Sequence, residues 1–159
     1  MTQTQYEEQN MSVFNVEIEY PIHINGQDKV EFADLLDSDV LYQLDQVKWR
    51  LYRALQLQAS GAKAVFSVTC LEHEHNIRLT LLDDTESGRV ELKFESNIAV
   101  YESKKDLFGL LTRQVKQFIN FERLNVEDAR RYLTYFLLNN LDALIYTYKV
   151  DDFGEMIVA

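Results

Sequence analysis

Two hydrophobic periodicities, kept apart along the chain, constrain this fold more than any other feature of the sequence. From Phe14 to Tyr20 every second side chain is apolar or aromatic. This period of two is typical of a strand with one buried face. From Val40 to Leu55 and from Ala129 to Tyr148 apolar residues recur every three or four positions, which is typical of helices.

Each of these two helical segments has recognisable ends. The first is expected to begin after Asp37 or Ser38, which suit the N-terminal turn of a helix, and to end at Ser60–Gly61. The last is expected from Val126 to about Tyr148, with Asn125 as its N-cap. The core stripe of the first helix would consist of Val40, Leu44, Val47, Leu51 and Leu55.

A third helix is expected to begin near Ser103. Ser103 and Asp106 have the spacing of a capping box, with Asp in place of the usual Glu. Gly109 would weaken this helix by about 1 kcal/mol relative to alanine. Its apolar stripe would consist of Leu107, Leu111, Val115, Phe118 and Ile119.

Three further segments have the pattern of strands. They are Ala64–Leu71, Ile77–Leu81 and Val90–Glu95, and the last is expected to resume at Ile98–Tyr101 after a break. Pro21 lacks the N–H that a strand ladder needs, so it predicts the end of the first strand or a sheet edge. Short connections make these strands antiparallel neighbours.

Because strands and helices are segregated along the chain, we predict an α+β fold. It would hold an antiparallel sheet of about four strands packed against helices, in the order β-α-β-β-β-(β)-α-α. The 159 residues suit a flexible tail over 1–11, a single domain over 12–150 and an acidic C-terminal tail over 151–159. Small secretion chaperones and several bacterial inhibitor proteins share this broad layout, as an analogy of topology only.

The negative charge is concentrated in one part of the sequence. The chain has a formal net charge of −10, and its first 45 residues hold ten acidic residues against one basic residue, Lys29. This balance disfavours direct binding of nucleic acid, which needs a basic stripe. The acidic segment either serves solubility or steers a basic protein partner. In the second interpretation the electrostatic interface would include Glu17, Glu19, Asp34, Asp37 and Asp39.

Aromatic residues lie beside the core stripe of the first expected helix. Tyr42, Trp49, Tyr52 and Arg53 are spaced for one flank of that helix. Packing inside the protein is the favoured explanation, and the alternative is an interface, because Trp, Tyr and Arg dominate binding hot spots. A homodimer through such a face is the simplest form of that alternative.

His73 and His75 form the clearest cluster with metal-binding chemistry. On a strand they would point to the same face and supply two ligands. Further ligands would have to come from elsewhere, such as His23, and a polar strand end followed by a turn is the favoured explanation. The single cysteine, Cys70, is expected to act as a small buried hydrophobe.

No phosphate loop, nucleophile elbow or zinc-protease motif occurs, so enzymatic activity is a minority interpretation and no cofactor is predicted. A lone cysteine, no signal-peptide pattern and no long apolar run favour a cytoplasmic protein that does not enter a membrane. The leading hypothesis is a non-enzymatic protein-binding module: an inhibitor, an immunity-like protein, or a small chaperone or adaptor. The alternatives are a small-ligand or metal-binding protein that uses His73 and His75, and a DNA-mimic inhibitor of a nucleic-acid-binding protein.

Overall fold

The structure is a computed structural model, and it describes residues 11–24, 27–58, 62–83, 88–106 and 108–157. Its elements in chain order are β1 (Phe14–Ile24), β2 (Gln27–Leu35), α1 (Asp37–Asp45), α2 (Trp49–Gln58), β3 (Val65–Cys70), β4 (Asn76–Leu81), β5 (Leu92–Lys105), β6 (Thr112–Leu124), α3 (Val126–Leu137) and α4 (Leu141–Ile157).

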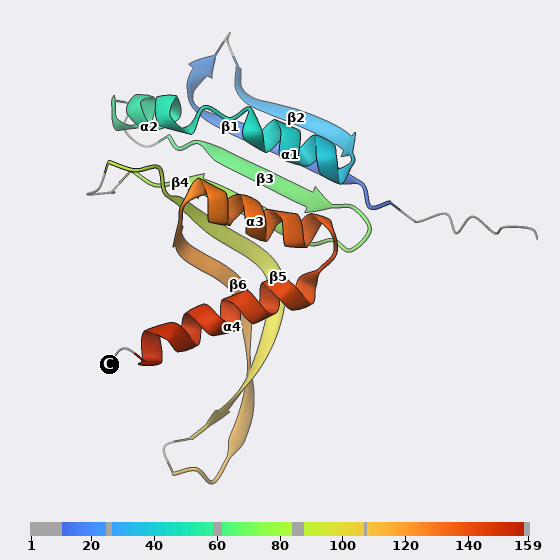
Figure 1. Cartoon of the computed structure of the whole chain (residues 1–159), viewed down its shortest axis with the longest axis vertical. Coiled ribbons are helices and arrows are strands. Elements are labelled where there is room, and N and C mark those ends of the chain that lie inside the picture. The colour runs from blue at the N-terminus through green and yellow to red at the C-terminus, as the bar shows by residue number, and fades with distance from the viewer. Residues whose placement is uncertain (1–10, 25–26, 59–61, 84–87, 107, 158–159) are drawn as a thin grey trace, which may run out of the picture.

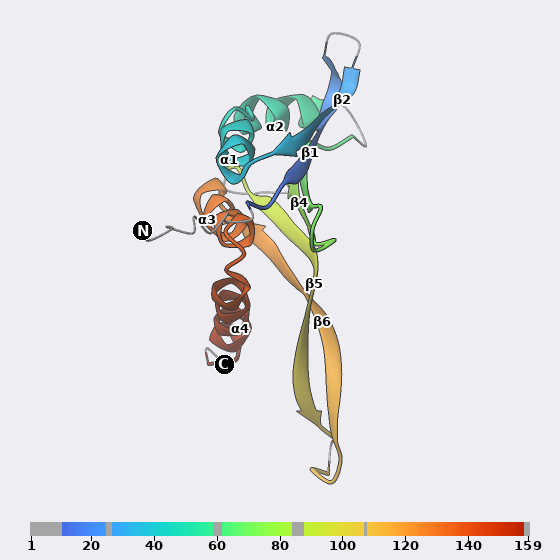
Figure 2. The same cartoon turned by 90° about the vertical axis from the view of Figure 1, so that its right-hand side faces the viewer.

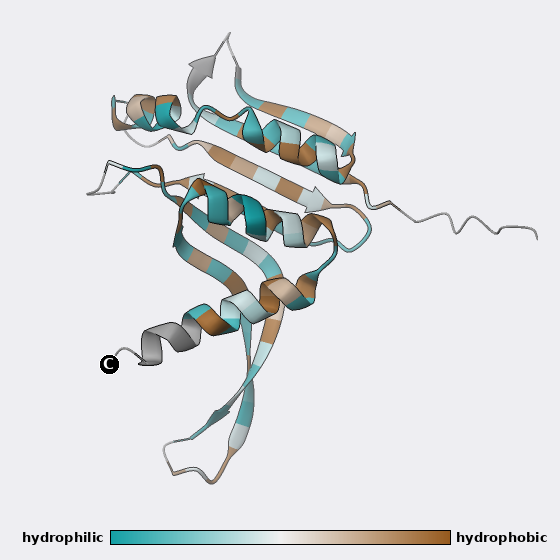
Figure 3. Cartoon of the chain, viewed as in Figure 1, coloured by the Kyte–Doolittle hydropathy of each residue, from teal (hydrophilic) through white to brown (hydrophobic). Residues whose placement is uncertain are grey.

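The strands form one antiparallel sheet in the order β2-β1-β3-β4-β5-β6 (Figure 1). The four helices of the described residues lie on one face of this sheet, and no described helix covers the opposite face, which we call the open face (Figure 2). Apolar and polar bands alternate along the strands (Figure 3), as a sheet with one buried face requires. The prediction of an α+β fold with an antiparallel sheet packed against helices is confirmed.

The predicted strand number and order were wrong: the sheet has six strands rather than about four. The segment after Asn25–Gly26 returns as β2, in which Val30 and Phe32 pair with β1. Pro21 does not end β1, because it lies beyond the pairing with β3 and inside a register shift between β1 and β2. A proline at such an irregularity removes no ladder hydrogen bond.

The helix predicted from Ser103 to Ile119 was also wrong. This segment contains the outer part of β5, a turn and the first half of β6, paired from Ala99↔Phe118 to Lys105↔Thr112, while Leu107 lies outside the described residues. Gly109 has a φ of +66°, which suits a turn. The apolar residues in this segment fit both periods, and antiparallel pairing with β5 decides in favour of the strand.

The first predicted helix is divided into α1 and α2, with a break at Gln46–Lys48, and its predicted end at Ser60–Gly61 lies outside the described residues. Val40 and Leu44 are buried as predicted, but the break changes the phase of the stripe. In α2 the large rings of Trp49 and Tyr52 enter the core, while Leu51 turns outward with 48% of its surface exposed. Burying two large aromatic rings removes more apolar surface from water than burying one leucine.

The last predicted helix is likewise divided, into α3 and α4. Asn139 adopts a φ of +54°, a conformation that asparagine tolerates better than most residues. Asn140 then accepts a hydrogen bond from the Ala143 N–H through its side chain, at 3.3 Å, and so starts α4. Two consecutive asparagines are the local signal for this break.

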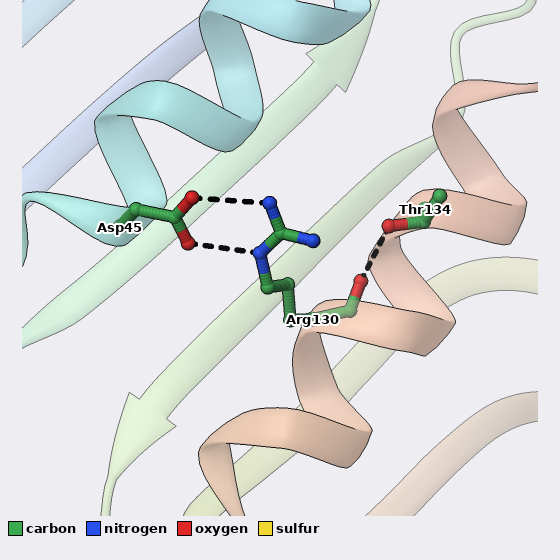
Figure 4. A network of polar contacts seen from close by, with 3 residues as sticks. All are labelled: Asp45, Arg130 and Thr134. Atoms are coloured by element: carbon green, nitrogen blue, oxygen red, sulfur yellow. Dashed lines mark hydrogen bonds and ion pairs between the residues drawn. The ribbon is translucent and has the colours of Figure 1, made fainter.

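An exposed ion pair joins the two helices that cover the middle of the sheet. Arg130 of α3 donates from Nε and Nη2 to the two carboxylate oxygens of Asp45 at the end of α1, at 2.9 and 3.0 Å (Figure 4). The Arg130 carbonyl accepts a hydrogen bond from Thr134 Oγ1 at 2.8 Å. The two parallel hydrogen bonds orient α1 and α3 relative to each other. Both side chains stay about half exposed, so the ion pair contributes about 1 kcal/mol at most to the free energy of unfolding.

The proposed division into tails and one domain stays a prediction. Residues 1–10 lie outside the described residues, and α4 continues to Ile157. Within the ranges that the structure describes, no helix has both the length and the apolar character needed to cross a membrane.

Candidate functional site

The outer halves of β5 and β6 form a two-stranded arm that projects beyond the rest of the sheet (Figures 1 and 2). It starts where Asn97 interrupts β5. The Asn97 side chain accepts from the Asn76 N–H and donates to the Glu74 carbonyl, both at 2.8 Å. These bonds satisfy the backbone at the start of β4, so β5 continues past Ser96 paired with β6 alone. We call residues 99–118 the arm.

The turn at the end of the arm is held by Asp106. Its Oδ1 accepts hydrogen bonds from the Phe108 N–H at 3.2 Å and from the Leu110 N–H at 3.0 Å. The Asp106 N–H donates to the Leu111 carbonyl, at 3.0 Å, and closes the hairpin. The capping box predicted for Ser103 and Asp106 was therefore wrong, because Ser103 lies in β5 and Asp106 accepts the backbone N–H groups of a turn. These bonds fix the backbone that carries the neighbouring apolar side chains.

Three large apolar side chains are exposed at this turn. Phe108 and Leu110 are each 83% exposed and Leu111 is 71% exposed. We call these three residues the arm tip. Grouped apolar side chains on a protruding element mark an interaction site more often than scattered ones do. Sequence reasoning missed this site, although Phe108-Gly109-Leu110-Leu111, between strand-like charged segments, is a signal for an apolar hairpin turn.

The arm has the opposite charge balance to the protein as a whole. It contains four basic residues, Lys104, Lys105, Arg113 and Lys116, against Glu102 and Asp106. Seven residues from the start of the arm to its turn span about 20 Å. This exceeds the screening length of about 8 Å at physiological salt, so the acidic body has little electrostatic effect at the arm tip.

A second candidate surface is a hollow beside the first turn of α2, with a volume of about 960 Å³. Its volume lies in the range of small-ligand sites. We call it the α2 hollow. It is lined by Val47, Lys48, Trp49, Arg50, Leu51, Arg53, Gly88, Arg89, Val90 and Val126.

The acidic residues proposed as an electrostatic interface are divided between two places. Glu17 and Glu19 lie on β1 and face the open side of the sheet, opposite the buried face of that strand. Partial burial raises the pKa of Glu17; a hydrogen bond with Glu19 acts in the same direction and Lys29 opposes it. Lys29 Nζ lies 3.7 Å from the Glu17 carboxylate and 3.3 Å from that of Glu31.

Asp34, Asp37 and Asp39 lie together at the connection from β2 to α1. Asp39 accepts a hydrogen bond from the Leu36 N–H at 3.3 Å, and Asp37 accepts one from the Ser38 N–H at 2.8 Å. Their charges also suit the positive end of α1. Asp37 and Asp39 therefore stabilise the start of α1. The carboxylates of Asp34 and Asp39 are still exposed to solvent. Their proposed role in an interface stays a prediction.

The proposed aromatic anchors do not form one surface. Tyr42 is 61% exposed on α1, whereas Trp49 and Tyr52 are 6% and 8% exposed and belong to the core. Tyr52 packs edge-on against Tyr20, with ring centroids 5.6 Å apart. Arg53 donates to the Gly88 carbonyl at 3.2 Å. Packing inside the protein, which was favoured over an interface, explains the positions of Trp49 and Tyr52.

His73 and His75 lie in the turn between β3 and β4, with ring centroids 6.2 Å apart. Cys70 is buried at the end of β3. Across the described part of the chain, no three His, Cys, Asp or Glu side chains gather to hold a metal ion. The His23 side chain lies outside the described residues, so a metal site there stays a prediction.

Comparison with protein-family models, curated proteins and solved structures gives no match for this chain.

Proposed function

We propose that the protein is a non-enzymatic protein-binding module that engages its partner through the arm. The observation that carries this proposal is the exposure of Phe108, Leu110 and Leu111 at the end of a projecting hairpin. In the isolated chain these side chains leave a large apolar area in water, which is unfavourable. Burial in a partner would recover that free energy. Inhibitors, immunity-like proteins and small chaperones or adaptors are the classes of protein that work by such contacts.

The neighbouring residues define what kind of partner surface fits the arm. Asp106 already holds the backbone of the turn, so little backbone conformational entropy remains to be lost when the arm tip binds. Lys104, Lys105 and Arg113 are exposed next to the arm tip. The matching surface is therefore an apolar recess with an acidic rim.

The acidic N-terminal region is the second part of the proposal. Asp34 and Asp39 are exposed on β2 and α1, and these two elements lie away from the arm (Figure 1), so the two residues would meet a different surface of the partner. Charges of this kind act mainly on the rate of association. We propose that they steer a basic region of the partner while the arm tip supplies the contact area.

Photo-cross-linking in cells of the source organism tests the arm contact. A benzophenone amino acid in place of Phe108 should yield one dominant adduct with another protein. The same amino acid in place of Leu57, which is 59% exposed on α2, should not yield it, because this position lies outside the arm. Equal cross-linking from both positions, or no adduct from position 108, would contradict the proposal.

The steering role predicts a salt effect on association with the partner identified by cross-linking. Asp34→Asn removes one charge and keeps a residue type that tolerates the φ of +57° at this position. It should lower the association rate constant by about twofold at low salt and leave it unchanged at high salt. Asp142→Asn, an equal charge change at the exposed start of α4, is the control. Stopped-flow rates that do not depend on salt would overturn the steering role.

A further inference from the structure

We propose that the α2 hollow binds a small organic anion: a flat apolar body that carries a phosphate, sulfonate or carboxylate group. This site is separate from the arm and goes beyond partner binding. The argument starts from the composition of its lining. Ten lining residues belong to the described part of the chain, and of these four are basic and none is acidic. The whole chain has 16 basic and 26 acidic residues, so an unselected surface would show the opposite balance.

The α2 hollow also differs in its charges from another hollow of the described structure. A hollow of about 740 Å³ on the open face of the sheet is lined by both signs of charge, including Glu19, Asp28 and Lys63. Charges of both signs neutralise one another there. The described lining of the α2 hollow contains no carboxylate, and an anion would be attracted to the exposed Lys48 and Arg50.

Two of the four cations are placed to contact a ligand. Lys48 and Arg50 are exposed at the first turn of α2, where the helix dipole already favours an anion. Cations at this end are unfavourable for the helix itself, and α1 and α3 instead have acidic residues in their first turns. Arg53 and Arg89 take part in other contacts within the protein, so we assign the contact with the anionic group to Lys48 and Arg50 alone.

The remaining lining is apolar and suits the body of such a ligand. Val47, Val90 and Val126 are half-buried, and Leu51 stays 48% exposed. Trp49 is 6% exposed, and its buried Nε1 has no hydrogen-bond partner among the described residues. Apolar walls with a few convergent charged groups are the usual composition of a small-molecule site.

The chain contains a single tryptophan, and it lines the α2 hollow, so its fluorescence reports on binding at this place. The probe is 8-anilinonaphthalene-1-sulfonate, with N-phenyl-1-naphthylamine as the matched compound that lacks the sulfonate. Titration of the full-length protein with the sulfonate should quench Trp49 emission and reach saturation. The neutral compound should bind at least tenfold more weakly, because it has no negatively charged group for Lys48 and Arg50 to bind.

Charge reversal separates a local site from general attraction. K48E/R50E should weaken binding of the sulfonate at least tenfold and leave the neutral compound unaffected. K104E/K105E on the arm changes the net charge equally and should leave both affinities unchanged. Circular dichroism verifies that each variant is folded, which is expected because all four residues are exposed. Unchanged binding to K48E/R50E, equal weakening by both double variants, or no saturable quenching would overturn the proposal.

Discussion

Replacing Gln56 with alanine is expected to lower the free energy of unfolding by about 2–4 kcal/mol, a large effect for one polar residue. Gln56 lies on α2 and is only 4% exposed. Its Oε1 accepts a hydrogen bond from the Ala64 N–H at 2.9 Å, and its Nε2 donates to the Leu81 carbonyl at 3.0 Å. The alanine variant leaves two backbone groups unpaired in a buried place, each at a cost of about 1–3 kcal/mol.

The position of these bonds explains why the effect should be global. Ala64 and Leu81 stand where β3 begins and β4 ends, so Gln56 attaches α2 to the middle of the sheet. Urea unfolding followed by circular dichroism measures the loss. Gln58 is exposed on the same helix. Gln58→Ala should therefore stay within about 0.5 kcal/mol of the wild type. A Gln56→Ala protein as stable as the Gln58→Ala protein would refute this role.

The parts of the fold that the sequence predicts well are those whose local signals agree with their tertiary environment. β4 and the first seven residues of β1 alternate between apolar and polar residues, and that alternation matches their buried and open faces. The N-cap at Asn125 is confirmed: its side chain accepts a hydrogen bond from the Asp128 N–H at 2.7 Å. The irregularity at Ser96–Asn97 is also real, as a register shift inside β5.

The arm could not be predicted from local periodicity alone. Val115 and Ile119 are four positions apart, which suits one helix face, and they also lie on the same face of a strand. Their strand conformation depends on pairing with β5, where Val115 faces Glu102. The phase change in α2 has the same origin, because the preference of Trp49 over Leu51 for the core depends on the surrounding packing.

The candidate surfaces, too, can be predicted from the sequence only where their residues are close together along the chain. The acidic region is visible in the sequence because its residues are close together along the chain. The α2 hollow combines the start of α2 with Gly88–Val90, and Arg53 and Gly88 are 35 positions apart. Only the fold brings these segments together. Of the three arm-tip residues, only Leu111 was assigned to the core stripe of the predicted helix, and its exposure follows once that helix is a hairpin.

The second large effect concerns the arm tip. The triple variant F108S/L110S/L111S should weaken binding of the partner by about 100-fold or more, because buried apolar anchors each contribute about 1–2 kcal/mol or more to such contacts. Its free energy of unfolding should stay within about 0.5 kcal/mol of the wild type. The reason is that these side chains are 71–83% exposed and have little packing to lose.

The most direct measurement is the affinity, by isothermal titration calorimetry, of the cross-linked partner for three proteins. These are the wild type, the arm-tip variant and the control variant L57S/L138S/Y146S, whose three side chains are 59–70% exposed on or beside the helices. We predict a loss of about 100-fold or more for the arm-tip variant alone, with equal stability of all three proteins. Unchanged affinity of the arm-tip variant, or an equal loss in the control variant, would contradict the proposal that the arm is the partner-binding element.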